Sequence, residues 1–305
     1  MSTNNNNSYA VCFGEILWDI FPAGSRAGGA PFNVAYNLDK MGLEVQMISK
    51  IGDDQLGKDL LEKIKSWNIS TAYIQIDGEK PTGTVLANFD EHGEAHYDIV
   101  NDVAWDHIKI LPEHHGLVSN AEAFVFGSLI ARNEESKNTL LELVELAKFR
   151  VFDVNFRPPF IDFDLVKTLL GKADLVKMNK AELRQIIEFL GEEYKDEDTS
   201  IKHIQNYFDL NEIILTKGSK GARYFVGDKS YNFSAVSIEI TDTVGSGDSF
   251  LAGFLSKRIL GKTPEEIMKQ AITLGAFITS KSGACPDYTY EEFKTFRETH
   301  YSKTI

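Results

Sequence analysis

The chain has 305 residues, of which 43% are hydrophobic, enough for a large core in one or two domains. Its 45 acidic residues against 32 Lys and Arg give a net charge of −13, which disfavours nucleic acid and anionic membrane surfaces as partners. The two cysteines, Cys12 and Cys285, provide no disulfide framework or cysteine metal site.

Short apolar runs alternate with longer periodic stretches along the chain. Residues 1–8 are polar and are expected to form a disordered tail, and no apolar run reaches the roughly 18 residues of a membrane span, so we expect a cytoplasmic protein. The predicted order is strand 9–14, helix 31–41, strand 44–51, helix 53–67, strand 122–129, helix 134–148, strands 149–154, 174–178 and 212–216, and helices 246–260 and 264–280. This alternation predicts a mostly parallel sheet covered by helices on both faces.

Some segments break this alternation. Residues 82–89 and 94–100 alternate in β fashion around a turn, and residues 16–21 and 25–30 are short and extended. Together they predict a small second sheet. The acidic stretch 191–199 and the pair His114 and His115 are both interpreted as surface loops.

The stretch DTVGSGDSFLAGF, residues 242–254, places a glycine turn and a carboxylate at the start of an apolar helix. One interpretation is purely structural: Asp248 caps the helix and interacts favourably with its dipole. The other is chemical. Backbone amides at Gly245, Ser246 and Gly247 would bind an anion, and Asp248 beside them could accept a proton from an attacking hydroxyl, as phosphoryl transfer requires.

Competing nucleotide motifs are incomplete. The stretch SKRILGKT, residues 256–263, ends like a P-loop but has Ser256 in place of the first glycine and closes a helix instead of opening one. No G-x-G-x-x-G follows the first strand, so a dinucleotide-dependent oxidoreductase is disfavoured.

Several motifs in order along residues 9–300 resemble the ribokinase/fructokinase family of sugar kinases. They are GEILWDIFP (14–22), GGAPFNVAYNL (28–38), DVNFRPP (153–159), VKMNKAEL (176–183), LTKGSKGA (215–222) and the glycine stretch 242–254. The resemblance implies a doubly wound, mostly parallel α/β sandwich with a small β-sheet lid. It implies one domain, 9–303, with lid segments at about 15–30 and 82–104, and a homodimer paired through the lid.

The resemblance also implies roles for individual residues. The expected catalytic residues are Asp248 as general base, with Gly245, Ser246 and Gly247 as the anion hole. The expected sugar-binding residues are Asp19, Gly28, Gly29, Asn33 and Arg157. The expected ATP-binding residues are Asn179, Glu182, Thr216, Gly218 and Gly221, the first two holding the water shell of Mg²⁺. Asp242 and the backbone of Val244, with carbonyls near residues 280–283, would hold a monovalent cation such as K⁺.

The sequence motifs indicate the type of reaction more clearly than the identity of the sugar substrate. The motifs most resemble the bacterial fructokinase-like branch, which implies D-fructose phosphorylated with ATP to fructose 6-phosphate. The alternative is 2-keto-3-deoxygluconate, whose carboxylate a guanidinium at Arg157 could bind in a bidentate manner. Other sugars and nucleosides stay open, and Phe89 and Tyr97 could stack on a nucleoside base. A non-catalytic sugar sensor is disfavoured because Asp248 and both glycines are present.

Overall fold

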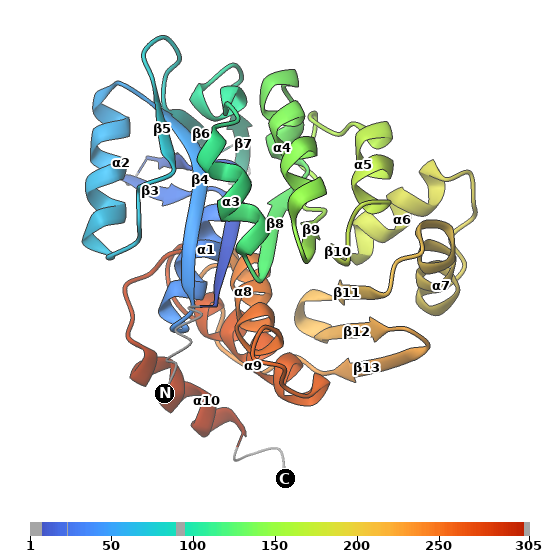
Figure 1. The fold of residues 1–305 in the computed structure, drawn as a ribbon. Helices are drawn as coiled ribbons and strands as arrows, with labels where there is room; N and C mark the ends of the chain where they lie inside the picture. Colours follow the sequence, from blue (N-terminus) through green and yellow to red (C-terminus); the bar gives the residue numbers. More distant parts are fainter. Residues whose placement is uncertain (1–7, 23, 90–94, 302–305) are drawn as a thin grey trace, which may run out of the picture.

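The structure, a computed structural model, describes residues 8–22, 24–89 and 95–301, without the side chains of 87–89, 95–97 and 301. The expected turn at 90–93 and the expected stacking by Phe89 and Tyr97 lie outside this description. Nearly all of the described chain forms one body around a large sheet (Figure 1).

The large sheet has nine strands in the order β13-β12-β11-β10-β9-β8-β1-β4-β5. Pairing is parallel from β11 to β5, and β12 and β13 extend the sheet in antiparallel fashion. This confirms the predicted fold class. The strands are β1 (Tyr9–Phe13), β4 (Glu44–Gly52), β5 (Ile74–Asp77), β8 (Ala123–Gly127), β9 (Arg150–Asp153), β10 (Leu175–Asn179), β11 (Glu212–Thr216), β12 (Ala222–Val226) and β13 (Lys229–Phe233).

Helices cover both faces of the sheet (Figure 1). One layer contains α1 (Ala30–Lys40), α2 (Gln55–Ser66), α8 (Ser246–Arg258), α9 (Pro264–Thr279) and α10 (Tyr290–Tyr301). The other contains α3 (Pro112–Asn120), α4 (Glu134–Leu146), α5 (Phe163–Leu170), α6 (Lys180–Phe189) and α7 (Glu197–Phe208). Short 3-10 turns are η1 (Ala104–His107), η2 (Leu129–Ala131) and η3 (Gly218–Lys220).

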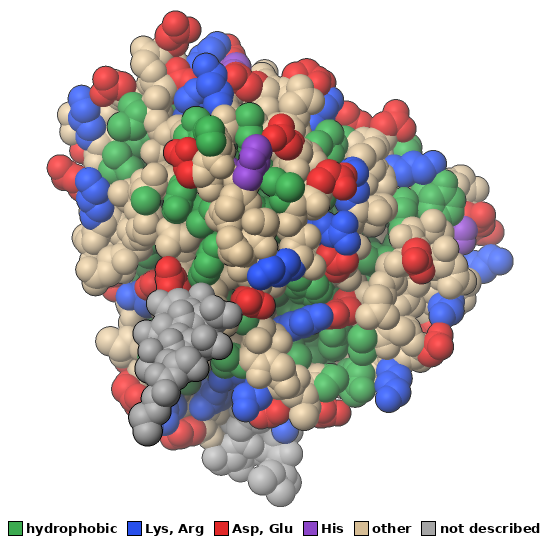
Figure 2. All heavy atoms as spheres, in the orientation of Figure 1, with side chains coloured by type: hydrophobic (Ala, Val, Ile, Leu, Met, Phe, Trp, Pro, Cys, Tyr) green, Lys and Arg blue, Asp and Glu red, His purple; other side chains and the backbone are tan. Residues whose placement is uncertain are grey.

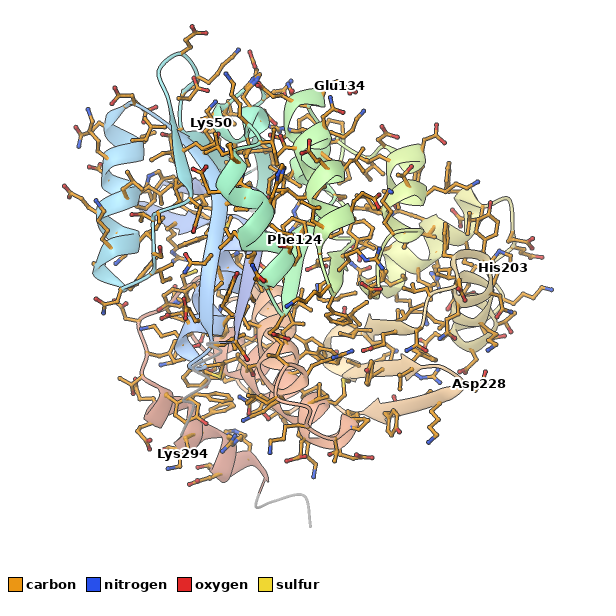
Figure 3. All side chains as sticks on the ribbon, viewed as in Figure 1. Lys50, Phe124, Glu134, His203, Asp228 and Lys294 are labelled. Carbon is orange, nitrogen blue, oxygen red and sulfur yellow. The ribbon has the colours of Figure 1, made fainter. Side chains whose placement is uncertain are left out.

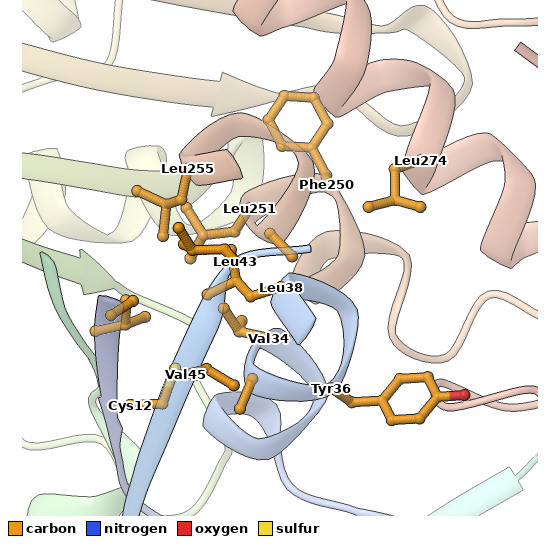
Figure 4. Close-up of a cluster of buried hydrophobic side chains, with 14 of the residues drawn as sticks. Cys12, Val34, Tyr36, Leu38, Leu43, Val45, Phe250, Leu251, Leu255 and Leu274 are labelled. Atoms are coloured by element: carbon orange, nitrogen blue, oxygen red, sulfur yellow. The ribbon is translucent and has the colours of Figure 1, made fainter. Parts of the chain in front are cut away.

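Each face of the sheet has its own hydrophobic core, because successive side chains of a strand point to opposite faces. Along β1, Cys12 belongs to the core under α1 and α8, whereas Phe13 belongs to the core under α3 and α4. Figure 4 shows Cys12 with Leu38 and Leu251 in the first core, and Phe124 is labelled in Figure 3 among the side chains of the second. Because the strands are buried on both faces, their sequences are nearly continuously apolar.

The small sheet is separate from the large one and has the order β3-β2-β6-β7. Its strands are β2 (Leu17–Phe21), β3 (Gly24–Gly28), β6 (Gly83–Phe89) and β7 (Ala95–Ile99). The Trp18 indole donates to the carbonyl of Leu56 in α2 at 2.9 Å, which joins this sheet to the main body. In the β2–β3 register, Asp19 lies opposite Arg26.

Two loop predictions are wrong. His114 lies within α3 and is fully buried. Its Nδ1 accepts a hydrogen bond from the Leu111 amide, and its ring packs on Tyr73. The acidic stretch ends inside α7, which begins at Glu197 because the Asp196 carboxylate caps the Thr199 amide at 2.8 Å.

Charged side chains of both signs are interspersed over the face shown in Figure 2. Within the described residues, every helix is too short or too polar to cross a bilayer.

Candidate active site

The first turn of α8 forms the centre of the site. Gly245 is the N-cap with φ 73°, and a side chain there would place its Cβ 2.3 Å from that of Ala284. The Ser246 amide donates to the Thr243 carbonyl at 3.3 Å. The amides of Gly247 and Asp248, by contrast, have no hydrogen-bond partner within the described part of the chain. Two free donors at a helix N-terminus favour an anion.

Asp248 lies in this first turn and is only 8% exposed. Its Oδ2 accepts a hydrogen bond from Asn33 Nδ2 at 2.8 Å, which links the first turns of α8 and α1. The Cys285 thiol donates to Asn33 Oδ1 at 3.4 Å and so fixes the orientation of the amide. Burial, aided by the charge of Asp153, raises the pKa of Asp248 to about 6. A carboxylate with a pKa near neutrality is suited to accept a proton.

A buried ion pair lies next to the free amides. Lys177 Nζ donates to both carboxylate oxygens of Asp153 at 2.8 Å, and both side chains are almost fully buried. A Cβ at Gly247 would lie 3.2 Å from Lys177 Nζ, so the ammonium group adjoins the turn that carries the free amides. Burial is the largest single effect and lowers the pKa of Lys177, but the charges of Asp153, Asp248 and Glu182 together outweigh it, so the pKa is raised. The ammonium group therefore adds positive charge to the anion site.

Sequence reasoning missed Lys177 and Asp153 as site residues, although both lie in quoted motifs. The available signal was a lysine within the apolar strand sequence LVKM, because a buried lysine requires a charged partner. The register of β9 and β10 places Asp153 directly beside Lys177.

The expected sugar-binding residues gather on the small-sheet side of Asp248. A Cβ at Gly28 would lie 2.3 Å from Asp19 Oδ2, so the carboxylate rests directly on that glycine. Gly29 has φ 109°, and a Cβ there would lie 2.2 Å from the Glu15 carbonyl oxygen. Burial raises the pKa of Asp19 to about 6, aided by the charge of Asp248. Asp19 and Asn33 thus place polar groups on this side of Asp248.

Glu15 is a second group that sequence reasoning missed. Its side chain is buried, Oε1 accepts from the Ala30 amide at 3.2 Å, and Oε2 has no hydrogen-bond partner among the described residues. Burial raises the pKa of Glu15 to about 7, and backbone amides and Arg157 lower it in part. Glu15 supports the turn at Gly29 that opens α1.

Arg157 is exposed and follows β9. Its guanidinium donates to the carbonyl of Phe156 at 3.1 Å and forms no ion pair with any described residue. Its positive charge nevertheless lowers the pKa values of Glu15, Asp19 and Asp248. The guanidinium therefore lies near enough to these carboxylates to act on their charge, and it is available to a ligand.

A cavity of about 590 Å³ opens on the other side of the α8 turn. It is bordered by Ser246 and Gly247, by the expected ATP-binding residues Asn179, Thr216, Gly218 and Gly221, and by apolar residues that include Val236, Ile238, Ile240, Phe250 and Ile272. Gly221 has φ 90°, and a Cβ there would lie 2.0 Å from the Phe233 carbonyl oxygen. The cavity combines an apolar wall with an anion site at one end, which suits a nucleotide.

Asn179 and Glu182 form a capping box at the start of α6. Asn179 Oδ1 accepts from the Ala181 and Glu182 amides, and the Glu182 carboxylate accepts from the Asn179 and Phe156 amides. Within the described residues, no group of three or more His, Cys, Asp and Glu side chains could hold a metal ion. Each oxygen of these two side chains therefore already accepts from a backbone amide, and their expected role in holding the water shell of Mg²⁺ stays a prediction.

Asp242 and Val244 lie in the loop before α8, but Asp242 is surrounded by hydrogen-bond donors. Its Oδ1 accepts from the Val244 amide at 3.0 Å, and its Oδ2 accepts from the Gly283 amide and from Arg26. These contacts do not fit the expected cation site, because a cation needs oxygen ligands that are not already turned toward donors.

Comparisons with known proteins agree with this geometry. The family model described as pfkB family carbohydrate kinase matches residues 10–289. Fructokinase-2 of Solanum lycopersicum is 25% identical over 311 residues, covering 92% of this chain and 93% of that protein. A fructokinase structure from Xylella fastidiosa with bound ATP has a TM-score of 0.84 at 20% identity, covering 97% of this chain and 99% of that one.

A fructokinase double mutant from Vibrio cholerae O395, solved with fructose, ADP and potassium ion bound, has a TM-score of 0.80 at 20% identity. It covers 95% of this chain and 98% of that one. At these identities the structural likeness establishes a shared fold.

Proposed function

The chain belongs to the pfkB family of carbohydrate kinases and is a sugar kinase, and from this premise we propose that it phosphorylates D-fructose with ATP to give fructose 6-phosphate. The observation that carries the phosphoryl-transfer chemistry is the buried Asp248, held by Asn33 at 2.8 Å in the helix turn that borders a nucleotide-sized cavity. Relatives named fructokinase support the choice of sugar.

In the proposed reaction, Asp248 orients the sugar hydroxyl and accepts its proton as the hydroxyl oxygen attacks the γ-phosphorus of ATP. A new P–O bond forms to the sugar, the bond to the β-phosphate oxygen breaks, and ADP leaves. Asp19 and Asn33 would hold other sugar hydroxyls, with Gly28 and Gly29 allowing the sugar to approach the backbone. The hydrogen bond from Asn33 keeps the attacking geometry of Asp248 fixed.

The transferring phosphoryl group carries negative charge that the site must stabilise. In our proposal the amides of Gly247 and Asp248 donate to it, and the ammonium group of Lys177 lies near it because Lys177 adjoins Gly247. Mg²⁺ bound with ATP would neutralise phosphate charge, with Asn179 and Glu182 holding its water shell. Thr216, Gly218 and Gly221 would line the nucleotide phosphates and ribose.

One observation favours a second candidate substrate. Arg157 is exposed and forms no ion pair with a described residue, so it could bind an anionic sugar such as 2-keto-3-deoxygluconate.

A substrate panel tests both candidates. We expect ADP release with Mg-ATP to be fastest with fructose, against 2-keto-3-deoxygluconate, ribose, glucose, tagatose and adenosine. Arg157→Gln should then change the KM for fructose by less than about tenfold, because a neutral sugar gains no ion pair. If the keto acid is the better substrate and Arg157→Gln raises its KM about 100-fold or more, Arg157 is a carboxylate clamp and the fructose proposal fails.

The pH dependence of kcat/KM tests the role of Asp248. The base must be ionised to accept a proton, and its pKa is raised to about 6, so kcat/KM should fall as the pH drops below 6. Asp19 has a pKa raised to about 6 as well, so the acidic limb reports the coupled pair. The profile is measured from pH 5 to 8, and a flat profile across that range would contradict the assignment.

A further inference from the structure

The Asp242 carboxylate lies in the loop that leads into the anion site. Its Oδ2 accepts from Arg26 Nη1 at 2.9 Å and from the Gly283 amide at 3.0 Å, and its Oδ1 accepts from the Val244 amide at 3.0 Å. All three partners are donors, and one carries a full positive charge. The carboxylate is therefore already neutralised by the protein itself.

Two of the neighbouring carbonyls are engaged as well. The Thr279 carbonyl accepts from the amides of Thr241 and Asp242, and the Ser280 carbonyl accepts from the Thr241 hydroxyl. The carbonyls of Val244, Ser282 and Gly283 accept no hydrogen bond within the described part of the chain, so they could face a cation. A resident monovalent cation would, however, lie close to the Arg26 guanidinium, where like charges repel.

Arg26 reaches this loop from β3 of the small sheet. Its side chain passes over Gly283, where a Cβ would lie 3.2 Å from Arg26 Cδ, and φ at Gly283 is +79°. The guanidinium carbon lies 5.1 Å from the centre of the Phe21 ring. The side chain is 46% exposed, so an ion from solvent could reach the carboxylate if the guanidinium were removed.

We propose that the guanidinium of Arg26 is the built-in cation of the phosphoryl-transfer site, replacing a bound potassium ion and making catalysis independent of monovalent cations; this rests on the proposed kinase function. Arg26 acts as a positioning residue. It holds Asp242, whose Oδ1 holds the Val244 amide immediately before the Gly245 turn and the free amides of α8. Arg26 lies opposite Asp19 in the small sheet, so the strand pair proposed to bind sugar would also supply this positive charge.

Turnover in KCl and in choline chloride at equal ionic strength tests the inference. We expect the unmodified enzyme to have the same kcat in both salts within about twofold. Arg26→Ala should lose at least about tenfold in choline, because the turn before α8 loosens, and should recover most of that loss in KCl as K⁺ takes the freed carboxylate. Arg26→Lys keeps a positive charge that can replace the single hydrogen bond from Arg26 Nη1 to Asp242 Oδ2, and should stay insensitive to K⁺.

Thermal unfolding gives a readout that needs no sugar, so failure of the proposed substrate does not obscure the result. KCl in place of choline should raise the unfolding temperature of Arg26→Ala by about 2–4 °C and leave the unmodified protein unchanged. The matched control is Arg184→Ala, which removes a surface guanidinium stacked on Tyr194 and should behave like the unmodified protein. The inference is overturned if KCl stimulates the unmodified enzyme about tenfold, or if Arg26→Ala is slow and unresponsive to KCl in both assays.

Discussion

Asp248→Asn should lower kcat by about 10²–10⁴-fold while the fold and the KM values for sugar and ATP change little, because a general base typically contributes that factor. Asparagine has nearly the same shape, and its oxygen can still accept the hydrogen bond that Asn33 Nδ2 now donates at 2.8 Å. The loss should therefore be chemical and not structural. Turnover within about tenfold of the unmodified enzyme would refute Asp248 as the base.

The same variant should have a distinctive pH-dependent stability. The native pKa of Asp248 is raised to about 6 from an ordinary value of 3.8. Between pH 3.8 and pH 6, the native state therefore binds a proton at this carboxyl that the unfolded chain has released. Ionised Asp248 thus destabilises the fold above pH 6, and this cost disappears as the pH falls through 6 toward 4. The melting temperature of Asp248→Asn should exceed that of the unmodified protein at pH 8, and this advantage should shrink at pH 5 and nearly vanish at pH 4.

A matched control is Asp39→Asn in α1, where burial also raises the pKa of the carboxyl. Asp39 lies near the opposite end of α1 from Asn33, so this change should reproduce the stability trend without the loss of turnover. An equal loss of turnover in both variants would mean that the effect of Asp248→Asn is not specific to the site.

The sequence allowed the fold class to be predicted because its signals are local. Gly42 closes α1, the Thr263 capping box opens α9, and the apolar run of β11 is bounded as predicted. The missed helix α3 has a weak local signal, since its sequence PEHHGLVSN is polar and contains a glycine. Burial of His114 depends on packing against Tyr73, which no local pattern indicates.

The site was predictable to the extent that it lies in contiguous motifs. Motif resemblance indicated Asp248 and Asn33, and the structure brings them into direct contact although they are 215 residues apart. The contact between Arg26 and Asp242 was not predictable, because it joins the small sheet to the loop before α8 across 216 residues and is not part of any local pattern. Charge pairs that depend on tertiary packing are the part of a site that one sequence cannot supply.

Lys177→Met should lower kcat by about 10²–10³-fold, the usual effect of removing a preorganised group that stabilises transition-state charge. The ammonium group adjoins Gly247 beside the free amides, so its loss weakens the field on the transferring phosphoryl group. The variant should also be destabilised by about 3–5 kcal/mol, because Asp153 is left as a buried, unpaired carboxylate. Chemical denaturation and steady-state kinetics measure the two effects.

The double variant Lys177→Met with Asp153→Leu separates these effects. Replacing both members of a buried ion pair with apolar residues is often neutral for stability, so the free energy of unfolding should return near that of the unmodified protein. Turnover should stay low, because the positive charge beside Gly247 is still missing. If turnover recovers together with stability, the pair is purely structural. If stability recovers alone, the positive charge of Lys177 is required for phosphoryl transfer, and the buried position of the pair is the means by which the protein holds that charge against the anion site.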